Sequence, residues 1–219
     1  MHYRDRASAG RRLAASLEEL RGTGAVVLGL PRGGVPVAHA VAHALGLPLD
    51  IVLVRKLGVP WHPELAMGAI GEGGARVLNE DVIRSSRVGS GDVARVERAE
   101  SHELERRAHL LRSGRPALRL RDRTAVIVDD GMATGATAAV ACQFARSAGA
   151  NRVLVAVPIA MPEAVRRVQV VADRVVCPYT PDDLTGVGGA YADFHQLADA
   201  EVTELLDDRP DLTPHSGGS

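Results

Sequence analysis

Apolar and polar residues alternate along this chain in a pattern typical of a protein built from both strands and helices. Apolar runs of strand length cover residues 25–30, 50–56, 124–130, 152–160 and 173–177. Between them, apolar residues recur every three or four positions, as in amphipathic helices. We expect helices over 5–21, 36–45, 92–112, 161–172 and 194–206, and another from about Gly135 to Ala148. Strands that alternate with helices predict a parallel sheet with right-handed crossovers, flanked by helices.

The remaining segments predict loops and one small hairpin within a single domain over residues 1–206. Residues 57–66 contain prolines and are expected to form a loop, whereas 66–70 and 75–79 flank a glycine-rich turn and suit a hairpin. Residues 178–193 form a further loop, and the polar tail 207–219 is expected to fray. Because ligands of parallel sheets bind beyond the carboxyl ends of the strands, the loops after residues 30, 55, 130 and 177 are the candidate site.

Composition and charge exclude several classes of protein. The 219 residues carry a net charge of -1 and only 3% are aromatic, which argues against a nucleic-acid partner. Cys142 and Cys177 have no metal-ligand spacing and cannot form a disulfide scaffold, so we expect a reduced, cytoplasmic setting. No apolar run approaches the ~20 residues needed to cross a bilayer, and the first residues lack the apolar core of a signal peptide.

The strongest chemical signal is VIVDDGMATGAT, residues 126–137. An apolar strand ends in Asp129 and Asp130, and a loop of small residues then opens a helix. Backbone N–H groups of this loop, the helix N-terminus and the hydroxyls of Thr134 and Thr137 can converge on a phosphate. The carboxylates suit the hydroxyls of a sugar that bears this phosphate. A turn with a helix cap is the alternative for the Asp pair taken alone.

Residues 126–138 resemble the phosphoribosyl-pyrophosphate (PRPP) signature of the type I phosphoribosyltransferases. The resemblance extends over roughly residues 5–206 and is greatest to bacterial members whose acceptor is unassigned. It implies a parallel-sheet core with a small hood, an inserted helical segment over 79–115 and a mobile loop over 57–75. It also implies that Asp129 and Asp130 hold the ribose hydroxyls and that one loop binds the 5′-phosphate, through Gly131, Met132, Ala133, Thr134, Gly135, Ala136 and Thr137.

Two further loops resemble the pyrophosphate-binding segments of this family. In PRGG, Gly33 and Gly34 permit close approach of the backbone and Arg32 can bind two phosphate oxygens. In VRKLG, Arg55 and Lys56 lie at the carboxyl end of the second predicted strand. All but one of the 26 basic residues are Arg, and the exception, Lys56, falls at this position, so we expect it to act in catalysis with the two aspartates.

The loop after the last predicted strand is the expected binding site for the acceptor. It contains Tyr179, Tyr191 and Phe194, whose rings either stack on a planar base or anchor the loop. The family members that act on hypoxanthine or guanine carry an Asp where this chain has Ala133, and a Lys where it has Ala136. A 6-oxopurine acceptor is therefore disfavoured.

The resemblance implies transfer of a phosphoribosyl group from PRPP to a nitrogenous acceptor, with release of pyrophosphate. Mg²⁺ would be carried by PRPP near Asp129 and Asp130, because it prefers phosphate oxygens, waters and one or two carboxylates. Two alternatives stay open at this point. One is a PRPP-binding regulator without turnover, and the other is a hydrolase or phosphorylase of phosphorylated ribosides.

The sequence assigns no catalytic role to two further features. The helix over 92–112 has a narrow apolar stripe, so most of its surface is solvated, caps the site or packs on a second copy in a homodimer. His39 and His43 are four residues apart on a predicted helix, a spacing that suits two metal ligands. The sequence shows no third ligand, so a solvated or partner-facing helix face is favoured.

Overall fold

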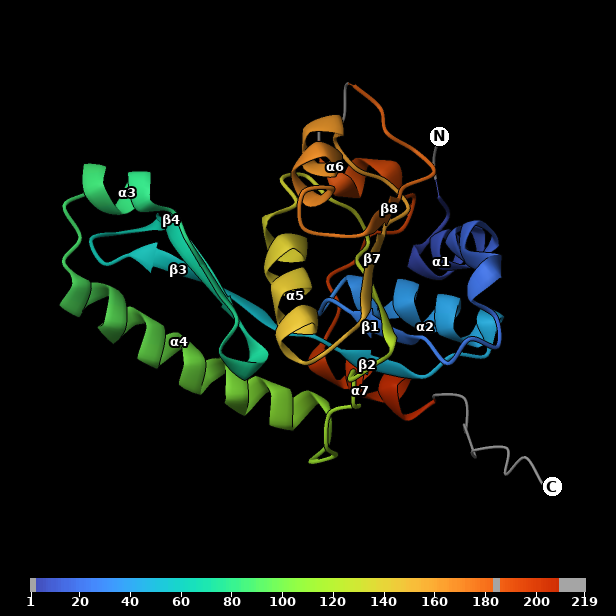
Figure 1. Cartoon of the computed structure of the whole chain (residues 1–219). Coiled ribbons are helices and arrows are strands. Elements are labelled where there is room, and N and C mark those ends of the chain that lie inside the picture. The colour runs from blue at the N-terminus through green and yellow to red at the C-terminus, as the bar shows by residue number, and fades with distance from the viewer. Residues whose placement is uncertain (1–2, 183–185, 209–219) are drawn as a thin grey trace.

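The computed structural model describes residues 3–182 and 186–208 and is centred on a five-stranded parallel sheet (Figure 1). Neighbouring strands lie in the order β2-β1-β6-β7-β8 and pair in parallel. Their bounds are β1 Val26–Gly29, β2 Leu49–Ile51, β6 Thr124–Val128, β7 Arg152–Ala156 and β8 Arg174–Val176. The predicted parallel sheet flanked by helices is therefore confirmed.

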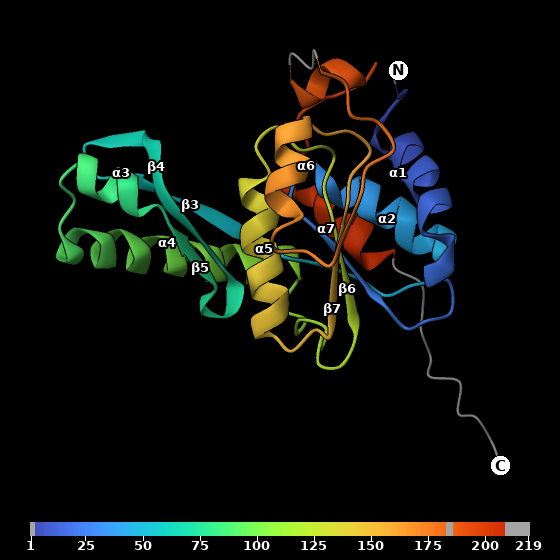
Figure 2. The ribbon, with the colours of Figure 1, turned by 45° about the horizontal axis from the view of Figure 1, so that its top comes forward.

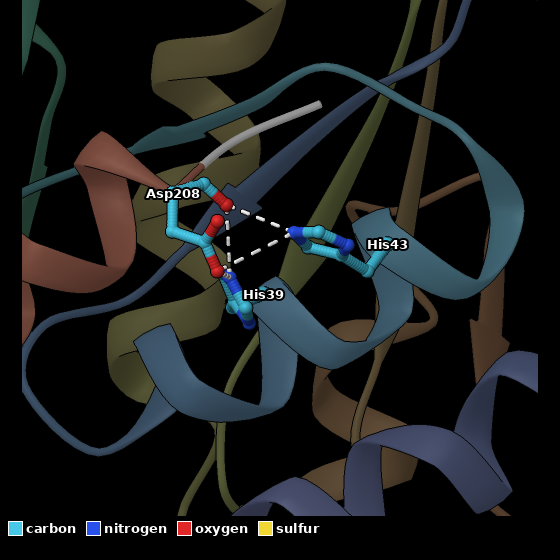
Figure 3. Close-up of side chains that lie close together, drawn as sticks. All are labelled: His39, His43 and Asp208. Carbon is cyan, nitrogen blue, oxygen red and sulfur yellow. Dashed lines mark hydrogen bonds and ion pairs between the residues drawn. The ribbon is translucent and has the colours of Figure 1, made fainter. Parts of the chain in front are cut away.

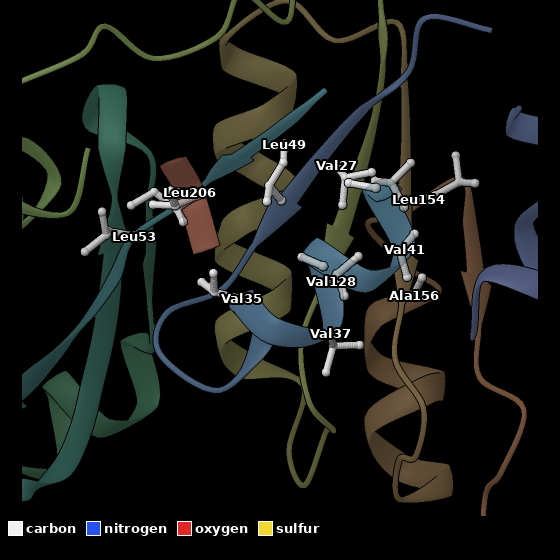
Figure 4. Close-up of a cluster of buried hydrophobic side chains, with 14 of the residues drawn as sticks. Val27, Val35, Val37, Val41, Leu49, Leu53, Val128, Leu154, Ala156 and Leu206 are labelled. Carbon is white, nitrogen blue, oxygen red and sulfur yellow. The ribbon is translucent and has the colours of Figure 1, made fainter. Parts of the chain in front are cut away.

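Helices cover both faces of this sheet because successive strand residues point to opposite sides. Val27 and Val128 lie in one core with α1, α2 and α7, part of which is drawn in Figure 4. Val26 and Ile127 lie in the other core with α5 and α6. The bounds are α1 Arg6–Ala14, continued by a 3-10 helix over Ala15–Leu20, then α2 Gly34–Leu45, α5 Ala136–Ser147, α6 Pro162–Val168 and α7 Asp199–Asp207.

A second, antiparallel sheet projects from the core and packs along one long helix (Figures 1 and 2). It corrects the sequence analysis, which expected residues 57–66 to be a loop and 50–56 to be one strand. Gly58 explains the difference, since a Cβ there would lie 2.5 Å from the carbonyl oxygen of Pro63. The register shifts at Gly58, and such irregularities are where strands tolerate proline. The projecting elements are β3 Val54–Val59, β4 His62–Gly71, a 3-10 turn Glu72–Gly74, β5 Arg76–Leu78, α3 Glu80–Ser85 and α4 Ser90–Leu111.

The projecting segment contains the expected features in a different form. The hairpin predicted over 66–70 and 75–79 is present as β4 and β5, and the predicted helix over 92–112 is α4. The expected mobile loop over 57–75 is largely strand, so any mobility would belong to a hairpin rather than to an open loop. That mobility stays a prediction.

A buried ion cluster joins the projecting segment to the main sheet. Arg112, directly after α4, donates to Asp50 at 2.9 Å, to Glu72 at 2.7 Å and to the carbonyl of Ile51 at 2.7 Å. All three charged side chains are at most 13% exposed. Burial alone would lower the pKa of the Arg112 guanidinium, but Glu72 and Asp50 outweigh it and hold that pKa above its ordinary value. The cluster therefore binds β2 to the 3-10 turn that follows β4.

The C-terminal helix starts later than the sequence predicts. The expected helix over 194–206 begins at Asp199, where Glu201 accepts a hydrogen bond from the backbone N–H of Ala198 at 2.7 Å. Residues 194–198 are therefore not part of the helix. Of the predicted tail, residues 209–219 lie outside the described residues. No helix in the described part of the chain is both long and apolar enough to cross a membrane.

Candidate active site

The carboxyl ends of β1 and β6 bring the PRGG loop against the acidic pair. Gly29 and Val128 are register partners, so the two loops leave the sheet side by side. A Cβ on Gly33 would lie 2.0 Å from the Oδ2 atom of Asp130, and one on Gly34 would lie 2.6 Å from the carbonyl of Val128. Both glycines therefore permit an approach that no other residue could make. The peptide bond between Pro31 and Arg32 is cis.

Residues 131–137 form a cradle around a cavity of about 220 Å³. The cavity is bordered by Asp129, by every residue from Gly131 to Ala138 and by Val187. Gly135 has a φ of 72° and directly precedes α5, so the loop leads into a helix N-terminus, whose first backbone N–H groups have no partner within the helix. Arg167 of α6 donates to the carbonyl of Thr134 at 3.0 Å and so places a positive charge beside the cradle. The geometry suits a bound phosphate.

The two aspartates form a half-buried pair whose charge is only partly balanced. Burial, and then the Asp130 carboxylate, raise the pKa of Asp129 well above its ordinary value. Burial also raises the pKa of Asp130, although Arg6 acts in the opposite direction. The Nε atom of Arg6 lies 2.8 Å from Oδ2 of Asp130, and both side chains are at most 13% exposed. Asp129 has no comparable counter-ion within the described residues.

This imbalance predicts that Asp129→Asn stabilises the ligand-free protein by about 1 kcal/mol at pH 8, as relief of active-site strain often does. The hydrogen bond from the backbone N–H of Asp130 to Oδ1 of Asp129 can be kept by asparagine. A carboxyl whose pKa is higher in the folded than in the unfolded state loses stability as pH rises above about 3.9. The advantage of the variant should therefore be absent below about pH 3 and grow with pH, as urea unfolding would measure. A variant less stable than wild type at pH 8 would contradict this account.

A second cavity of about 290 Å³ lies on the other side of the acidic pair. Two arginines border it, and the guanidinium of Arg6 lies over the ring of Phe194 at 3.9 Å from the centroid. Arg6 also donates to the carbonyl of His195 at 2.9 Å. The cavity therefore combines a positive charge, an aromatic ring and a carboxylate. Its lining is Arg6, Arg32, Gly33, Asp130, Phe194, His195, Gln196 and Leu197.

Sequence reasoning missed Arg6 and the segment after Phe194. A signal for Arg6 was present, because it lies seven positions before Leu13 and so on the apolar stripe of its helix. A charged residue on a buried face needs a partner, and that partner is Asp130. Residues 194–198 gave no comparable signal, because the three-residue spacing of the apolar Phe194 and Leu197 is also compatible with a helix.

The three aromatic residues expected at the acceptor site take different positions. Phe194 lines the second cavity. Tyr191 is buried beside Tyr3, stacks on Phe194 with the ring centroids 5.1 Å apart, and donates its hydroxyl to the carbonyl of Asp130 at 2.6 Å. Tyr179 pairs with Ile159 through the backbone and is not among the residues that line this cavity. Phe194 can therefore face a ligand, whereas Tyr191 positions Asp130.

The structure does not bring the basic residues of VRKLG to the acidic pair. Arg55 and Lys56 lie on β3 of the projecting hairpin. Arg55 donates to Glu100 of α4 at 2.7 Å, and the Nζ atom of Lys56 donates to the carbonyl of Glu64 at 3.0 Å. Neither lines the two cavities described above. Arg32 does, and its Nη1 atom lies 3.9 Å from Asp199 at the start of α7.

Comparisons with known proteins identify the family of this chain. The family model for the phosphoribosyl transferase domain matches residues 3–194. Two curated proteins of Mycobacterium tuberculosis, "Putative phosphoribosyl transferase Rv0571c" of strain H37Rv and "Putative phosphoribosyl transferase MT0597" of strain CDC 1551, are each 54% identical to this chain over 205 residues. The match takes in 94% of this chain but 46% of each relative, so the chain spans about half the length of these relatives.

A solved structure is similar along nearly its whole length. The crystal structure of TT1426 from Thermus thermophilus shares 44% sequence identity with this chain at a TM-score of 0.82, and the alignment covers 94% of this chain and 98% of that chain. The family model, the sequence relatives and this structure all point to the same family. The chain therefore belongs to the phosphoribosyl transferase domain family and has the type I phosphoribosyltransferase fold.

Proposed function

We propose that the chain transfers the phosphoribosyl group of PRPP to a nitrogenous acceptor and releases pyrophosphate. One observation carries this proposal: the acidic pair separates two cavities of different chemistry. Asp129 borders the phosphate cradle, and Asp130 borders the cavity that holds Arg6, Arg32 and Phe194. A ribose held by the two carboxylates would reach the cradle with its 5′-phosphate. Its anomeric carbon would then face the second cavity.

Each group has a defined task in this reaction. Displacement at the anomeric carbon builds positive charge on the ribose and negative charge on the leaving pyrophosphate, so the main task is electrostatic. Asp129 and Asp130 would bind the ribose hydroxyls and lie under the developing positive charge. The backbone of the PRGG loop and the guanidinium of Arg32 would bind pyrophosphate. A role for Arg55 and Lys56 stays a prediction, and it would require the hairpin to change position.

The residues present fit Mg²⁺ bound together with PRPP. Mg²⁺ takes oxygen ligands and is usually held by substrate phosphates and one or two carboxylates. Asp129 and Asp130 offer such oxygens, and burial together with the Asp130 carboxylate raises the pKa of Asp129, so a cation beside this pair would be favourable. When bound, Mg²⁺ would withdraw charge from the leaving group. No metal site made by protein ligands alone is needed here.

The second cavity supports a planar acceptor bound beside Phe194. Phe194 and the guanidinium of Arg6 form a stacked pair. This pair favours a flat ring with oxygen or other hydrogen-bond acceptors at its edge, because the guanidinium of Arg6 offers only donors. Ala133 and Ala136 stand where an Asp and a Lys are found in the enzymes that act on 6-oxopurines, so we place such acceptors outside the proposed class.

The test is PRPP binding and turnover by the purified chain. With Mg²⁺, we expect PRPP to bind in the micromolar range, and Asp129→Asn/Asp130→Asn to weaken that binding by at least about 100-fold, because the double variant loses two charged hydrogen bonds that contribute about 1.5–3 kcal/mol each. Asp81→Asn, at an exposed side chain of α3, is the matched control. Calorimetry that shows equal PRPP affinity in wild type and the double variant would overturn the site assignment.

Pyrophosphate release measured across a panel of nitrogenous acceptors separates the alternatives. Release that needs an acceptor supports transfer. Tight PRPP binding without release would point to a regulator or sensor, and release without any acceptor would point to a hydrolase.

A further inference from the structure

Three potential metal ligands meet on the side of the molecule where α7 ends (Figure 3). His39 and His43 lie one turn apart on α2, and both rings point toward Asp208, the residue that follows α7. The Nε2 atom of His39 is 3.0 Å from the carbonyl oxygen of Asp208 and 3.2 Å from its Oδ2 atom. The Nε2 atom of His43 is 2.9 Å from the same carbonyl and 3.7 Å from the same Oδ2. Residues far apart in the sequence thus supply the third ligand that the sequence did not show.

The three side chains converge on one small volume. One ligand atom from each of the three side chains lies within 4.8 Å of the others. The two imidazole rings have centroids 4.5 Å apart and are tilted by 46°, so their nitrogens approach one point from two directions. Ligand atoms that bind one ion at about 2.0–2.2 Å must lie closer to one another than 4.8 Å. The side chains of His43 and Asp208 are 46% and 73% exposed and can make that adjustment without disturbing the core.

The ligand chemistry selects the class of ion. Two neutral imidazoles with one carboxylate suit Zn²⁺ and the neighbouring ions Co²⁺, Ni²⁺ and Cu²⁺, whereas Mg²⁺ and Ca²⁺ prefer sites made of oxygen atoms alone. Three protein ligands leave a fourth position for water, or for the carbonyl of Asp208. This site is therefore distinct in composition and position from the oxygen ligands at Asp129 and Asp130.

We propose that His39, His43 and Asp208 form a binding site for a divalent transition-metal ion of the zinc class. The bound ion links α2 to the end of α7. The N-terminus of α2 follows the PRGG loop, and the N-terminus of α7 follows the segment that lines the second cavity. Metal binding would therefore stabilise the packing of two elements that begin at the candidate active site. The proposal does not depend on the transferase reaction.

Zn²⁺ titration of the untagged, chelator-treated chain, followed by calorimetry, tests the site. We expect one ion per chain with a micromolar Kd and a Zn²⁺-dependent rise in Tm. His43→Ala should weaken binding at least tenfold, and His39→Ala/His43→Ala should abolish the site. The matched control is His102→Ala/His109→Ala, which removes two exposed histidines of α4 and should leave the Kd unchanged.

A second readout separates a built site from weak surface binding. Co²⁺ bound by the three side chains in tetrahedral geometry absorbs strongly in the visible range, whereas Co²⁺ held by water and one histidine does not. We expect this absorption in wild type and in the α4 control, and its loss in Asp208→Asn/His43→Ala. Absence of one-to-one binding below about 100 μM Zn²⁺ would overturn the proposal. Equal Kd values in wild type and the His39/His43 variant would do the same.

Discussion

Arg6→Ala should weaken PRPP binding by roughly 100-fold at pH 7, although Arg6 is far from the PRPP signature in the sequence. Its guanidinium donates to Asp130 at 2.8 Å and lies over Phe194. Removal leaves Asp130 half-buried beside Asp129 with no opposite charge, and breaking such a pair typically costs about 3–5 kcal/mol. Part of that cost would appear as lost ligand affinity, because the ionised carboxylate is the form that binds ribose hydroxyls in the proposed reaction.

The pH dependence distinguishes a positioning role for Arg6 from a general loss of structure. Arg6 acts to lower the pKa of Asp130, against the effect of burial, so its removal should raise that pKa further. A higher pKa keeps the carboxyl protonated to higher pH. PRPP binding by the variant should therefore recover as pH rises from 6 to 9, whereas wild-type binding should change less. Calorimetry at several pH values measures this difference.

Arg4→Ala is the matched control for this experiment. Arg4 lies two residues earlier, its side chain is 76% exposed, and it pairs with Asp5. PRPP affinity should be unchanged in this variant. Arg6→Lys should restore part of the affinity, since it keeps the charge but not the fork of donors. Wild-type affinity in Arg6→Ala at every pH would show that Asp130 does not need this partner.

Arg112→Ala should lower the free energy of unfolding by about 3–5 kcal/mol, the typical result of removing one partner of a buried ion pair. The change would leave Asp50 and Glu72 buried without the guanidinium that binds both. Domains of this kind have total stabilities of about 5–15 kcal/mol, so the loss is a large fraction of the whole. Urea unfolding at pH 7 measures it.

The loss should be concentrated at the join between the hairpin and the main sheet. Amide hydrogen exchange in β3, β4 and α4 should therefore accelerate more in Arg112→Ala than exchange in β6 and β7. Arg106→Ala is the control on the same helix, because Arg106 pairs with Glu103 on the surface and is 57% exposed. Its removal should change the free energy of unfolding by less than about 1 kcal/mol. Equal effects of the two substitutions would show that the buried cluster contributes no more than a surface pair.

Patterns of neighbouring residues in the sequence predicted the strands and helices of the main sheet and the loop that follows Asp129 and Asp130. The order of strands and helices in the main sheet follows from short apolar runs and helical periodicity. The position of Asp129 and Asp130 at a carboxyl strand end follows from the same pattern, as does the glycine-rich loop before α5. The residues of the projecting hairpin were harder to assign, because Pro63 argued against a strand. The close approach at Gly58 that accommodates this proline is visible only in three dimensions.

The partners of the site residues were decided by the tertiary structure. Arg6 and Asp130 are 124 positions apart, and His39 and Asp208 are 169 positions apart. No periodicity links such residues, because their contact depends on how whole helices pack on the sheet. By itself, the sequence determined the fold class and the family, and it predicted the loop that we propose binds phosphate. Only the tertiary structure determined which charge neutralises Asp130, which aromatic ring faces the second cavity and which residue completes the histidine pair, since each depends on long-range packing.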